Sequence, residues 1–347
     1  RGVWLTNVDS DVLFETEKTE GAIALLAEAN FNTLYPTVWN WGYTLYPSKI
    51  AAEFTGRELD PTEGLQGRDV LAEIVERGHE RGMAVIPWFE FGFMAPADSE
   101  LAQRHPEWLT SRQDGSTIWW EGKVHQRVWL NPLRPDVQRF MTDLIVEIVS
   151  NYDIDGIQLD DHFGLPVAFG YDAYTVEAYK TTHNGAAPPN DVNNAEWVAW
   201  RAAQVTQLLE KISLAVKQAD ADAIVSVSPN PPAFAYNKYL QDWRRWVDLG
   251  IADEVIVQVY RDDIAVLEND LYNSGFYDVR SQVPTAIGLY TGPFLEAKTI
   301  ERLDREIQIV QAADYDGVAF FSWETTLWAF KGSDVPSVLT TLSARFS

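Results

Sequence analysis

The sequence contains no cysteine and only five histidines among its 347 residues. The absence of cysteine excludes disulfide bonds, thiolate nucleophiles and cysteine metal sites. No two histidines have the paired spacing of a helical or turn zinc motif, and no glycine-rich phosphate loop opens a helix. We therefore expect no catalytic metal and no other cofactor.

Basic residues are also scarce, with 27 Lys and Arg against 51 Asp and Glu and a formal net charge of -24. Binding nucleic acid or an anionic membrane requires a basic face, so neither partner is expected. A neutral or cationic ligand suits such a chain better. The alternative is that the acidic surface only keeps the protein in solution.

Long hydrophobic runs are absent, because no apolar stretch approaches the roughly 20 residues of a membrane span. We expect no transmembrane segment. Composition does not shift along the chain and no short repeat is visible, so residues 1–347 are expected to form one domain and a monomer. Since the chain begins at Arg1 without an initiator Met and enters a strand at once, we expect a leader or a further domain to precede it.

What the sequence does contain is a regular alternation of short apolar runs and amphipathic stretches. Alternating strands and helices are typical of a parallel sheet, and this length suits a single (β/α)8 TIM-type barrel with enlarged βα loops. This α/β barrel is the predicted fold. The expected strands are 2–6, 32–39, 84–91, 152–163, 223–228, 254–260, 285–290 and 317–323, and the expected helices are 20–29, 70–81, 135–150, 195–218, 300–313 and 335–345.

One connection, from about residue 92 to residue 131, is too long for a minimal turn and is rich in tryptophan. Long loops in compact domains are usually functional or disordered, and a segment this aromatic is expected to be ordered. The whole chain has 14 Trp, 14 Tyr and 16 Phe. These side chains can fill a core, but those at strand ends present flat apolar faces that suit sugar rings.

Acidic side chains end three of the predicted strands. In a parallel barrel, catalytic groups lie at the carboxyl ends of the strands. Glu90, Asp160 and Glu324 hold such positions. Hydrolysis of a glycosidic bond needs one carboxylic acid to protonate the leaving oxygen, and usually a second carboxylate that attacks, stabilises the cation or activates water. These three acids are therefore the candidate catalytic residues.

The segment from Tyr152 to Phe163, which reads YDIDGIQLDDHF, carries two adjacent acids. If its apolar side chains face the helices, strand alternation turns Gln158 and Asp160 toward the barrel axis. We therefore favour Asp160 over Asp161 as the catalytic residue. An acid just past a strand often caps the following turn, and His162 is expected to be a hydrogen-bonding partner.

Other polar and aromatic side chains near the strand ends are candidates for substrate binding. Aromatic rings would stack on sugars, while amides and the histidine would hydrogen-bond to hydroxyl or acetamido groups. Arg261 could pair with a carboxylate, and a surface ion pair is the alternative. The full set of binding candidates is Trp39, Trp41, Trp88, Trp119, Trp120, Asp161, His162, Asn230, Gln258, Tyr260, Arg261, Tyr290 and Trp323.

Seven short motifs run from the first residue to the last predicted strand. In chain order they are RGVWLTN at Arg1, PWFEF at Pro87, WLNP at Trp129, DGIQLDDHF at Asp155, SVSPNP at Ser226, QVYR at Gln258 and FSWE at Phe321. As a set they are specific, and the chain resembles the family-10-like glycosylhydrolase group. These are bacterial proteins that include cell-envelope enzymes acting on peptidoglycan strands.

The resemblance implies a TIM-type barrel, a location outside the cytoplasm (secreted, periplasmic or attached to the cell envelope) and a bacterial polysaccharide substrate that contains amino sugars. Glu90 and Asp160 look like its functional acids. The fourth strand departs from the D-G-x-D-x-D-x-E pattern of chitinase-type barrels, because Gln158 stands for the second acid and His162 for the terminal Glu. The proton donor would then come from another strand, with Glu90 or Glu324 as its source.

The leading interpretation is a glycoside hydrolase that cleaves a cell-envelope polysaccharide such as the glycan strand of peptidoglycan. Glu90 would be the general acid, Asp160 the nucleophile or the stabiliser of the oxocarbenium-like centre, and Glu324 a reserve for either role. One acid would have a raised pKa while its partner stays ionised. Two alternatives stay open, namely a glycan-binding barrel without catalysis and a transglycosylase that uses the same site.

Overall fold

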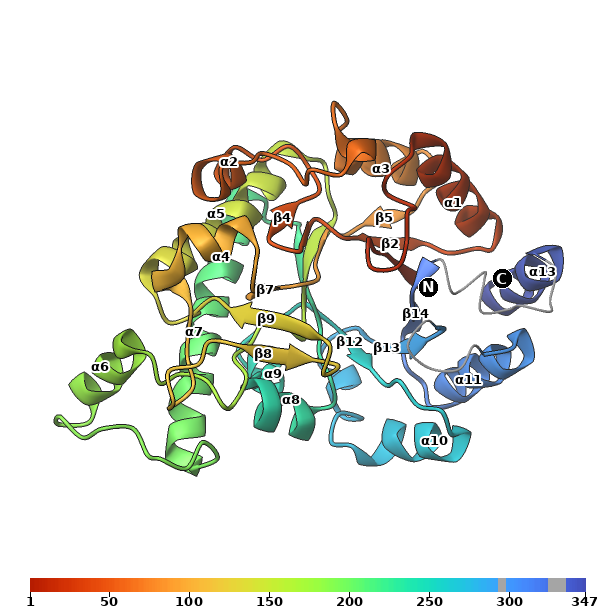
Figure 1. Cartoon of the computed structure of the whole chain (residues 1–347). Coiled ribbons are helices and arrows are strands. Elements are labelled where there is room, and N and C mark those ends of the chain that lie inside the picture. Colours follow the sequence, from red (N-terminus) through yellow and green to blue (C-terminus); the bar gives the residue numbers. More distant parts are fainter. Residues whose placement is uncertain (293–297, 324–334) are drawn as a thin grey trace.

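The fold is built on one parallel β-sheet with helices around it (Figure 1). The computed structural model describes residues 1–292, 298–323 and 335–347. The strands of the sheet are β1 (Gly2–Leu5), β2 (Thr33–Pro36), β5 (Ala84–Val85), β6 (Trp88–Phe89), β10 (Gly156–Asp160), β11 (Ile224–Ser228), β12 (Glu254–Gln258), β13 (Thr285–Tyr290) and β14 (Gly317–Phe321). They pair in the order β5-β2-β1-β14-β13-β12-β11-β10-β6, all in parallel, which confirms the predicted α/β class.

The first and last strands of that order follow one another in the chain. Only Ile86 and Pro87 separate β5 from β6, and Pro87 has no backbone N–H to donate to a neighbouring strand. β5 pairs with β2, whereas β6 pairs with β10, and Val38 N also donates to Trp88 O at 2.9 Å. The sheet therefore curls until its two ends meet at this segment.

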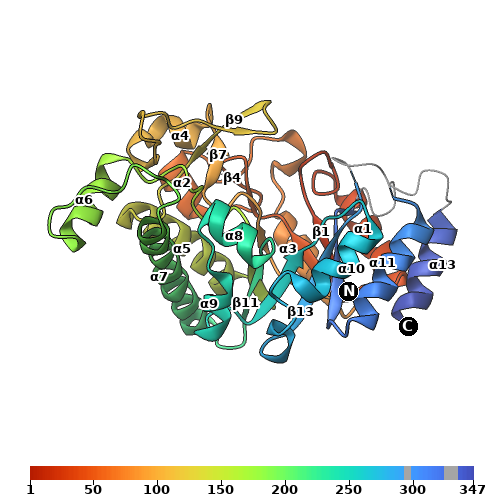
Figure 2. The same ribbon diagram turned by 90° about the horizontal axis from the view of Figure 1, so that it is seen from below.

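Helices cover the outside of the curled sheet (Figures 1 and 2). They are α1 (Thr16–Glu28), α2 (Lys49–Thr55), α3 (Val70–His79), α4 (Glu100–Arg104), α5 (Pro135–Asn151), α6 (Ala173–Thr182), α7 (Ala195–Ala219), α8 (Pro232–Tyr239), α9 (Trp243–Asp248), α10 (Ile264–Asn273), α11 (Ile300–Ala312) and α13 (Val335–Phe346). Both ends of the chain lie together, since Arg1 Nη1 donates to Phe346 O at 2.8 Å. Across the described ranges, none of these helices has the length and apolar character needed to cross a bilayer.

Two sets of apolar side chains pack against the two faces of the sheet. Ile157 and Leu159 of β10 belong to the large cluster between strands and helices. Trp4 packs in a smaller cluster inside the curled sheet, where its Nε1 donates to Gln158 Oε1 at 2.7 Å. Gln158 and, two residues on, Asp160 thus face the interior, which confirms the predicted alternation along this strand.

The long tryptophan-rich connection is ordered, as predicted, but it forms a sheet that the sequence pattern did not predict. Strands β7 (Met94–Pro96), β8 (Trp119–Glu121) and β9 (His125–Trp129) pair antiparallel in the order β7-β9-β8. The second strand is shorter than predicted, because after β2 the chain forms a separate hairpin of β3 (Trp39–Asn40) and β4 (Tyr43–Thr44). All of the strands in these two small sheets except β9 have only two or three residues, which is too short to show a period in a sequence.

Candidate active site

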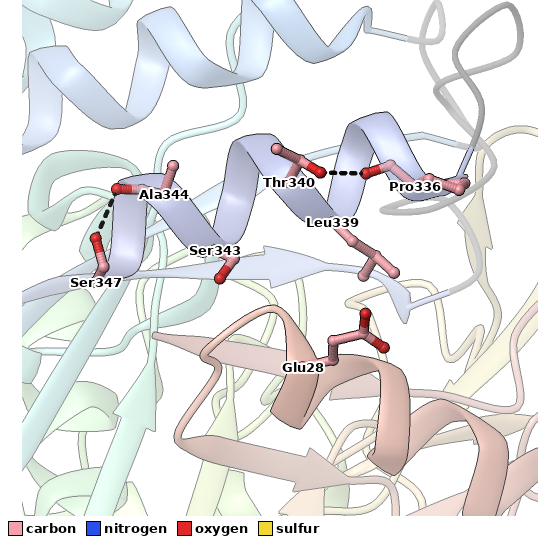
Figure 3. Close-up of a pocket in the computed structure, with 7 residues that line it drawn as sticks. All are labelled: Glu28, Pro336, Leu339, Thr340, Ser343, Ala344 and Ser347. Carbon is pink, nitrogen blue, oxygen red and sulfur yellow. Dashed lines mark hydrogen bonds between the residues drawn. The ribbon is translucent and has the colours of Figure 1, made fainter.

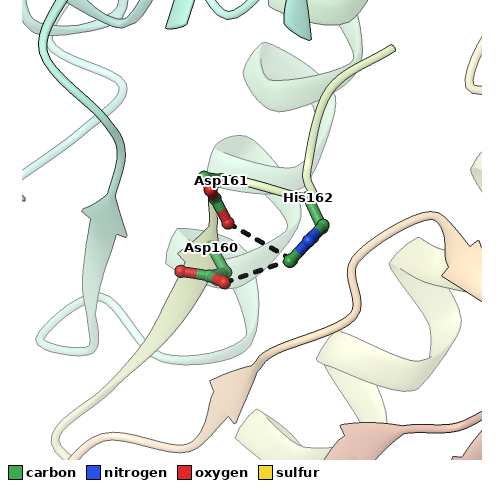
Figure 4. Close-up of side chains that lie close together, drawn as sticks. All are labelled: Asp160, Asp161 and His162. Carbon is green, nitrogen blue, oxygen red and sulfur yellow. Dashed lines mark ion pairs between the residues drawn. The ribbon is translucent and has the colours of Figure 1, made fainter. Parts of the chain in front are cut away.

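Asp160 is the last residue of β10 and lies beside Asp161 and His162 (Figure 4). Its side chain is almost completely buried. Oδ1 accepts hydrogen bonds from Ser228 Oγ at 2.9 Å and from Gln258 Nε2 at 2.8 Å. Both donors come from the ends of the next two strands of the sheet, β11 and β12, and they stabilise negative charge on Asp160.

Asp161 follows the strand and is held by the segment beyond β11. Asn230 Nδ2 donates to Asp161 Oδ2 at 2.7 Å. Burial raises the pKa of Asp161; the charge of His162 opposes that shift, and the adjacent Asp160 adds to it. Asp161 therefore holds a proton more readily than an exposed aspartate.

His162 links the acidic segment to the neighbouring strand. Its Nδ1 lies 3.0 Å from the backbone oxygen of Glu90, 3.4 Å from Asp160 Oδ2 and 3.2 Å from Asp161 Oδ1. Three oxygens around one nitrogen require that Nδ1 carry a hydrogen. Burial acts to lower the pKa of His162, but Asp161 and Asp160 outweigh it and raise that pKa to about 10. His162 is therefore an imidazolium cation at neutral pH.

Glu90 directly follows β6 and is 5% exposed. Its Oε2 accepts hydrogen bonds from Thr6 Oγ1 at 2.7 Å and Thr37 Oγ1 at 2.9 Å, which follow β1 and β2. Asn40 Nδ2 donates to the same oxygen at 2.9 Å. Burial raises the pKa of Glu90 to about 7, although the two hydroxyl donors act to lower it. Among the described residues no hydrogen bond reaches Oε1, so this oxygen can serve a reacting group.

A glycine allows the end of β6 to approach the acidic segment closely. Gly92 has a φ of 49°, and a Cβ at this position would lie 2.5 Å from the carbonyl carbon of His162. The two segments are also joined by Phe93 N, which donates to His162 O at 3.2 Å. A larger residue at position 92 would be strained and would clash with backbone, so Gly92 permits the contact between His162 and Glu90.

One face of the β8–β9 hairpin is turned toward these groups. The ring of Trp129 lies 5.9 Å from that of His162, and the partly buried Trp119 contacts Trp129 edge-on at 6.0 Å. Alternation along β8 puts Trp120 on the opposite face, where it is 52% exposed. Trp119 is thus near the carboxylates, whereas the predicted role of Trp120 in sugar stacking lacks support from its position.

A buried arginine fastens this hairpin to the sheet. The guanidinium of Arg127 lies 4.7 Å from the ring centre of Trp41 and 5.3 Å from that of Phe91, so it stacks against both. It also forms an ion pair with Glu121 at 2.7 Å. Trp41, one of the predicted binding residues, is partly buried and keeps this contact at the edge of the site.

A family model described as "Glycosyl hydrolase-like 10" matches residues 1–309 of the chain. The chain belongs to the glycosyl hydrolase-like 10 family. It is 28% identical to glycosyl hydrolase DigH of Escherichia coli over 262 residues, which cover 68% of this chain and 56% of DigH. It is 23% identical to glycosyl hydrolase YngK of Bacillus subtilis over 233 residues, which cover 57% of this chain and 40% of YngK. The chain therefore spans about half the length of these curated relatives.

Solved structures of TIM-barrel glycosidases share the fold of this glycosyl hydrolase-like 10 chain. The glycoside hydrolase domain of PgaB (BpsB) from Bordetella bronchiseptica aligns with a TM-score of 0.67 at 14% identity, over 99% of this chain and 98% of that domain. The catalytic domain of β-amylase from Paenibacillus polymyxa aligns with a TM-score of 0.64 at 12% identity, over 99% and 96% of the two chains. At such low sequence identities, the similarity shows a shared fold only.

In this glycosyl hydrolase-like 10 chain, the described acids Glu90, Asp160 and Asp161 lie together with His162 and the amides predicted for the site, whereas three aromatic candidates lie inside the protein. Trp39 is fully buried, with Nε1 donating to Gly92 O at 2.9 Å. Trp88 is 2% exposed within the inner cluster, and Tyr290 is also 2% exposed. All three are buried in this structure, so neither the predicted stacking of Trp39 and Trp88 on sugar nor the predicted binding role of Tyr290 is supported by their positions.

The remaining predicted residues lie beyond β12 and β14. Tyr260 and Trp323 keep part of their surface exposed, as sugar stacking requires. Arg261 Nε pairs with Asp270 of α10 at 2.7 Å, which fits the alternative of an ion pair with a neighbouring helix rather than with a substrate. Glu324, the third candidate acid, lies outside the described residues.

Several polar residues of the site were not among the candidates. Thr6, Thr37 and Asn40 bind Glu90, and Ser228 binds Asp160. Each lies within four residues of the carboxyl end of a strand. The signal that marked the acids, a polar side chain after an apolar strand, also marks these partners.

The ligand atoms of Asp160, Asp161 and His162 lie within 4.8 Å of one another, which is close enough to suggest a metal site within the described ranges. However, Nδ1 of His162 carries a hydrogen and cannot ligate a cation in this arrangement. The three side chains are better described as two acids ion-paired with one imidazolium.

A separate groove of about 490 Å³ lies on the outer helices, between α13 and the end of α1 (Figure 3). Its lining consists of Glu28, Pro336, Leu339, Thr340, Ser343, Ala344 and Ser347. A single carboxylate cannot supply both the proton donor and the second acid of glycoside hydrolysis. The groove therefore does not compete with the strand ends as an active site.

Proposed function

We propose that this chain is a glycoside hydrolase in which Glu90 is the general acid and Asp160 is the nucleophile or the stabiliser of the oxocarbenium-like centre. The observation that carries the proposal is the contrast between two buried carboxyl groups at one end of the sheet. The pKa of Glu90 is raised to about 7 by burial, whereas Asp160 is surrounded by donors and a cation. Such a contrast is typical of a site in which one carboxyl group donates a proton and the other acts as a carboxylate.

The surroundings of Glu90 suit proton donation. A carboxyl group with a pKa of about 7 is largely protonated below neutral pH and can give its proton to the leaving oxygen. Three donors hold Oε2 in place, which leaves Oε1 to carry that proton. Activity is expected to fall as the pH rises through about 7, because the ionised form cannot donate.

The surroundings of Asp160 suit a carboxylate that stabilises positive charge developing on the substrate. Ser228 and Gln258 donate to one oxygen, and the imidazolium of His162 faces the other. These groups are in place before substrate binds, so little reorganisation is needed when charge develops. Asp161 is a second candidate for the proton donor, because burial raises its pKa as well.

The proposed substrate is a bacterial cell-envelope polysaccharide that contains amino sugars, such as the glycan strand of peptidoglycan. Motif resemblance to envelope enzymes supports this choice, while the names of the curated relatives, which are called glycosyl hydrolases, support only a glycosidic bond as the target. We also propose that the protein is a monomer and is located outside the cytoplasm. It also counts β5 and β6 as one interrupted strand, which gives an eight-stranded barrel with the acids at its mouth.

Two isosteric substitutions test the assignment. Glu90→Gln should lower kcat by roughly 10²- to 10⁴-fold on the polysaccharide but spare an aryl glycoside, because a phenolate leaves without a proton. Asp160→Asn should be inactive on both substrates. New reducing ends and released phenol are the measurements, and Asp153→Asn, at a 98% exposed side chain, and Glu177→Gln are matched controls.

Each alternative predicts a different outcome. A wild-type protein that binds glycan but releases no reducing ends would be a binding barrel, and products longer than the substrate would identify a transglycosylase. If Asp161→Asn spares the aryl glycoside and Glu90→Gln does not, then Asp161 is the proton donor and the role given to Glu90 is wrong.

A further inference from the structure

A line of aromatic rings leads from the carboxylates onto helix α8. Trp129, whose ring is 5.9 Å from that of His162, stacks nearly parallel on Tyr239 at 6.2 Å. Tyr239 in turn lies 6.1 Å from Phe234. Exposure increases outward along this line, because Trp129 is fully buried, Tyr239 is partly buried and Phe234 is 48% exposed.

Helix α8 is held firmly against the acidic segment. Gln241, just after the helix, donates through Nε2 to both Asp160 O and Phe163 O at 3.0 Å. The helix end also accepts a hydrogen bond at 2.7 Å from Leu165 N to Tyr239 O. The aromatic line and the carboxylates are therefore parts of one rigid unit, and a ligand that contacts both would find them already arranged.

Tyr239 combines an apolar face with a polar edge. Burial and the negative charges of Asp161 and Glu121 keep its pKa above the usual range, so the phenol stays neutral and can donate a hydrogen bond. In the described part of the chain, no side chain accepts this hydrogen. A flat ring with a free donor at its edge matches a sugar, which offers an apolar face rimmed by hydroxyl groups.

We propose that Tyr239 and Phe234 form an additional subsite that holds a further sugar unit of the same polysaccharide chain, outside the unit that reacts at the carboxylates. This inference rests on the proposed function, since it assumes a polymeric glycan at Asp160. Continuity with the site favours this occupant, because each ring contacts the next from His162 outward. A protein partner is less suited, since one half-exposed phenylalanine is far smaller than a specific protein interface.

The subsite is tested by comparing long and short substrates. Phe234→Ala should reduce kcat/KM on the polysaccharide or a long amino-sugar oligosaccharide by about tenfold relative to an aryl glycoside of a single sugar. Tyr239→Phe keeps the ring and removes the hydroxyl, so it should lower the same ratio by less than Tyr239→Ala. Tyr272→Ala, at a 43% exposed aromatic residue on α10, should leave the ratio unchanged.

The outcomes separate this inference from the function on which it rests. If the wild-type protein cleaves no glycan, the proposed function fails and the subsite fails with it. If the wild type cleaves both substrates but Phe234→Ala leaves the ratio unchanged, the subsite alone is refuted. A loss that is equal on both substrates and accompanied by a lower melting temperature would show a structural role for Phe234, which also refutes the subsite.

Discussion

At the scale of single residues, the site shows how surroundings separate chemically similar acids. Glu90 and Asp160 are both buried at strand ends, but they meet different neighbours. Only neutral hydroxyl and amide donors bond to the Glu90 carboxyl group, on which the charge of His162 acts without a direct ion pair, whereas Asp160 is ion-paired with His162 at 3.4 Å. A cation stabilises a carboxylate more strongly than a neutral donor does, so the proton is expected on Glu90.

The raised pKa of Glu90 predicts a pH-dependent stability. Its pKa rises from 4.5 to about 7 on folding, so the folded protein holds this proton more tightly than the unfolded chain. The resulting stability is present below pH 4.5 and is lost as the pH rises through about 7. The wild type should therefore lose roughly 2.5 kcal/mol of unfolding free energy from this group between about pH 5 and about pH 8, whereas Glu90→Gln cannot ionise and should not show this loss.

Urea unfolding at the two pH values measures this difference. Glu177→Gln is the control, because its carboxylate on α6 is 76% exposed and should give the wild-type pH dependence. Parallel pH profiles for wild type and Glu90→Gln would mean that Glu90 is ionised in the folded protein throughout this range. The role of Glu90 as an acid would then be untenable.

At the scale of elements, the site depends on segments with very different sequence signals. The alternation in β10 was predictable, because five residues between clear flanks show a period of two. The partners of Glu90 were not, because the convergence of Thr6, Thr37 and Asn40 on one oxygen depends on the register between strands. A single sequence does not state which residues face each other across a sheet.

Aromatic residues were the least predictable part of the site. Trp39 and Trp119 both lie near strand ends and are chemically identical, yet one is fully buried and the other partly exposed. The difference arises because each lies in a short hairpin that no periodic pattern in the sequence predicts. Tyr239 and Phe234 were missed because they lie on α8, an eight-residue helix between β11 and β12 that the sequence pattern did not predict.

The anchoring of the β8–β9 hairpin predicts a local effect of Arg127→Met. The substitution removes the ion pair between the buried Arg127 and the partly exposed Glu121, together with the contacts of the guanidinium with two rings, so it should cost about 1–2 kcal/mol. Amide hydrogen exchange in residues 119–129 should become faster, while the core strands should stay protected.

Arg57→Met provides the matched control, because Arg57 also pairs with a glutamate, Glu100, but the Arg57 side chain is 47% exposed whereas that of Arg127 is 6% exposed. Such a pair contributes little, so this variant should unfold almost like wild type. Equal losses for the two arginines, or unchanged exchange in the hairpin of Arg127→Met, would argue against the anchoring role.

At the scale of the whole molecule, the net charge of -24 acts against the compact state. Like charges repel one another at the surface, and salt screens this repulsion over about 10 Å at 0.1 M. The melting temperature should therefore rise as sodium chloride is added at low ionic strength, which calorimetry can measure. Sedimentation in the same buffers should show a monomer, and a melting temperature that falls with salt would indicate that attractive ion pairs dominate.

Gly92 has a consequence for reading the sequences of relatives. A related chain can keep both acids and the histidine and still lose their arrangement, because a side chain at this position would force the segment after β6 away from His162. In a sequence comparison, such a chain would still have every proposed catalytic residue. The residue that stands at the position of Gly92 should therefore distinguish working members of the family from decayed ones better than the acids themselves.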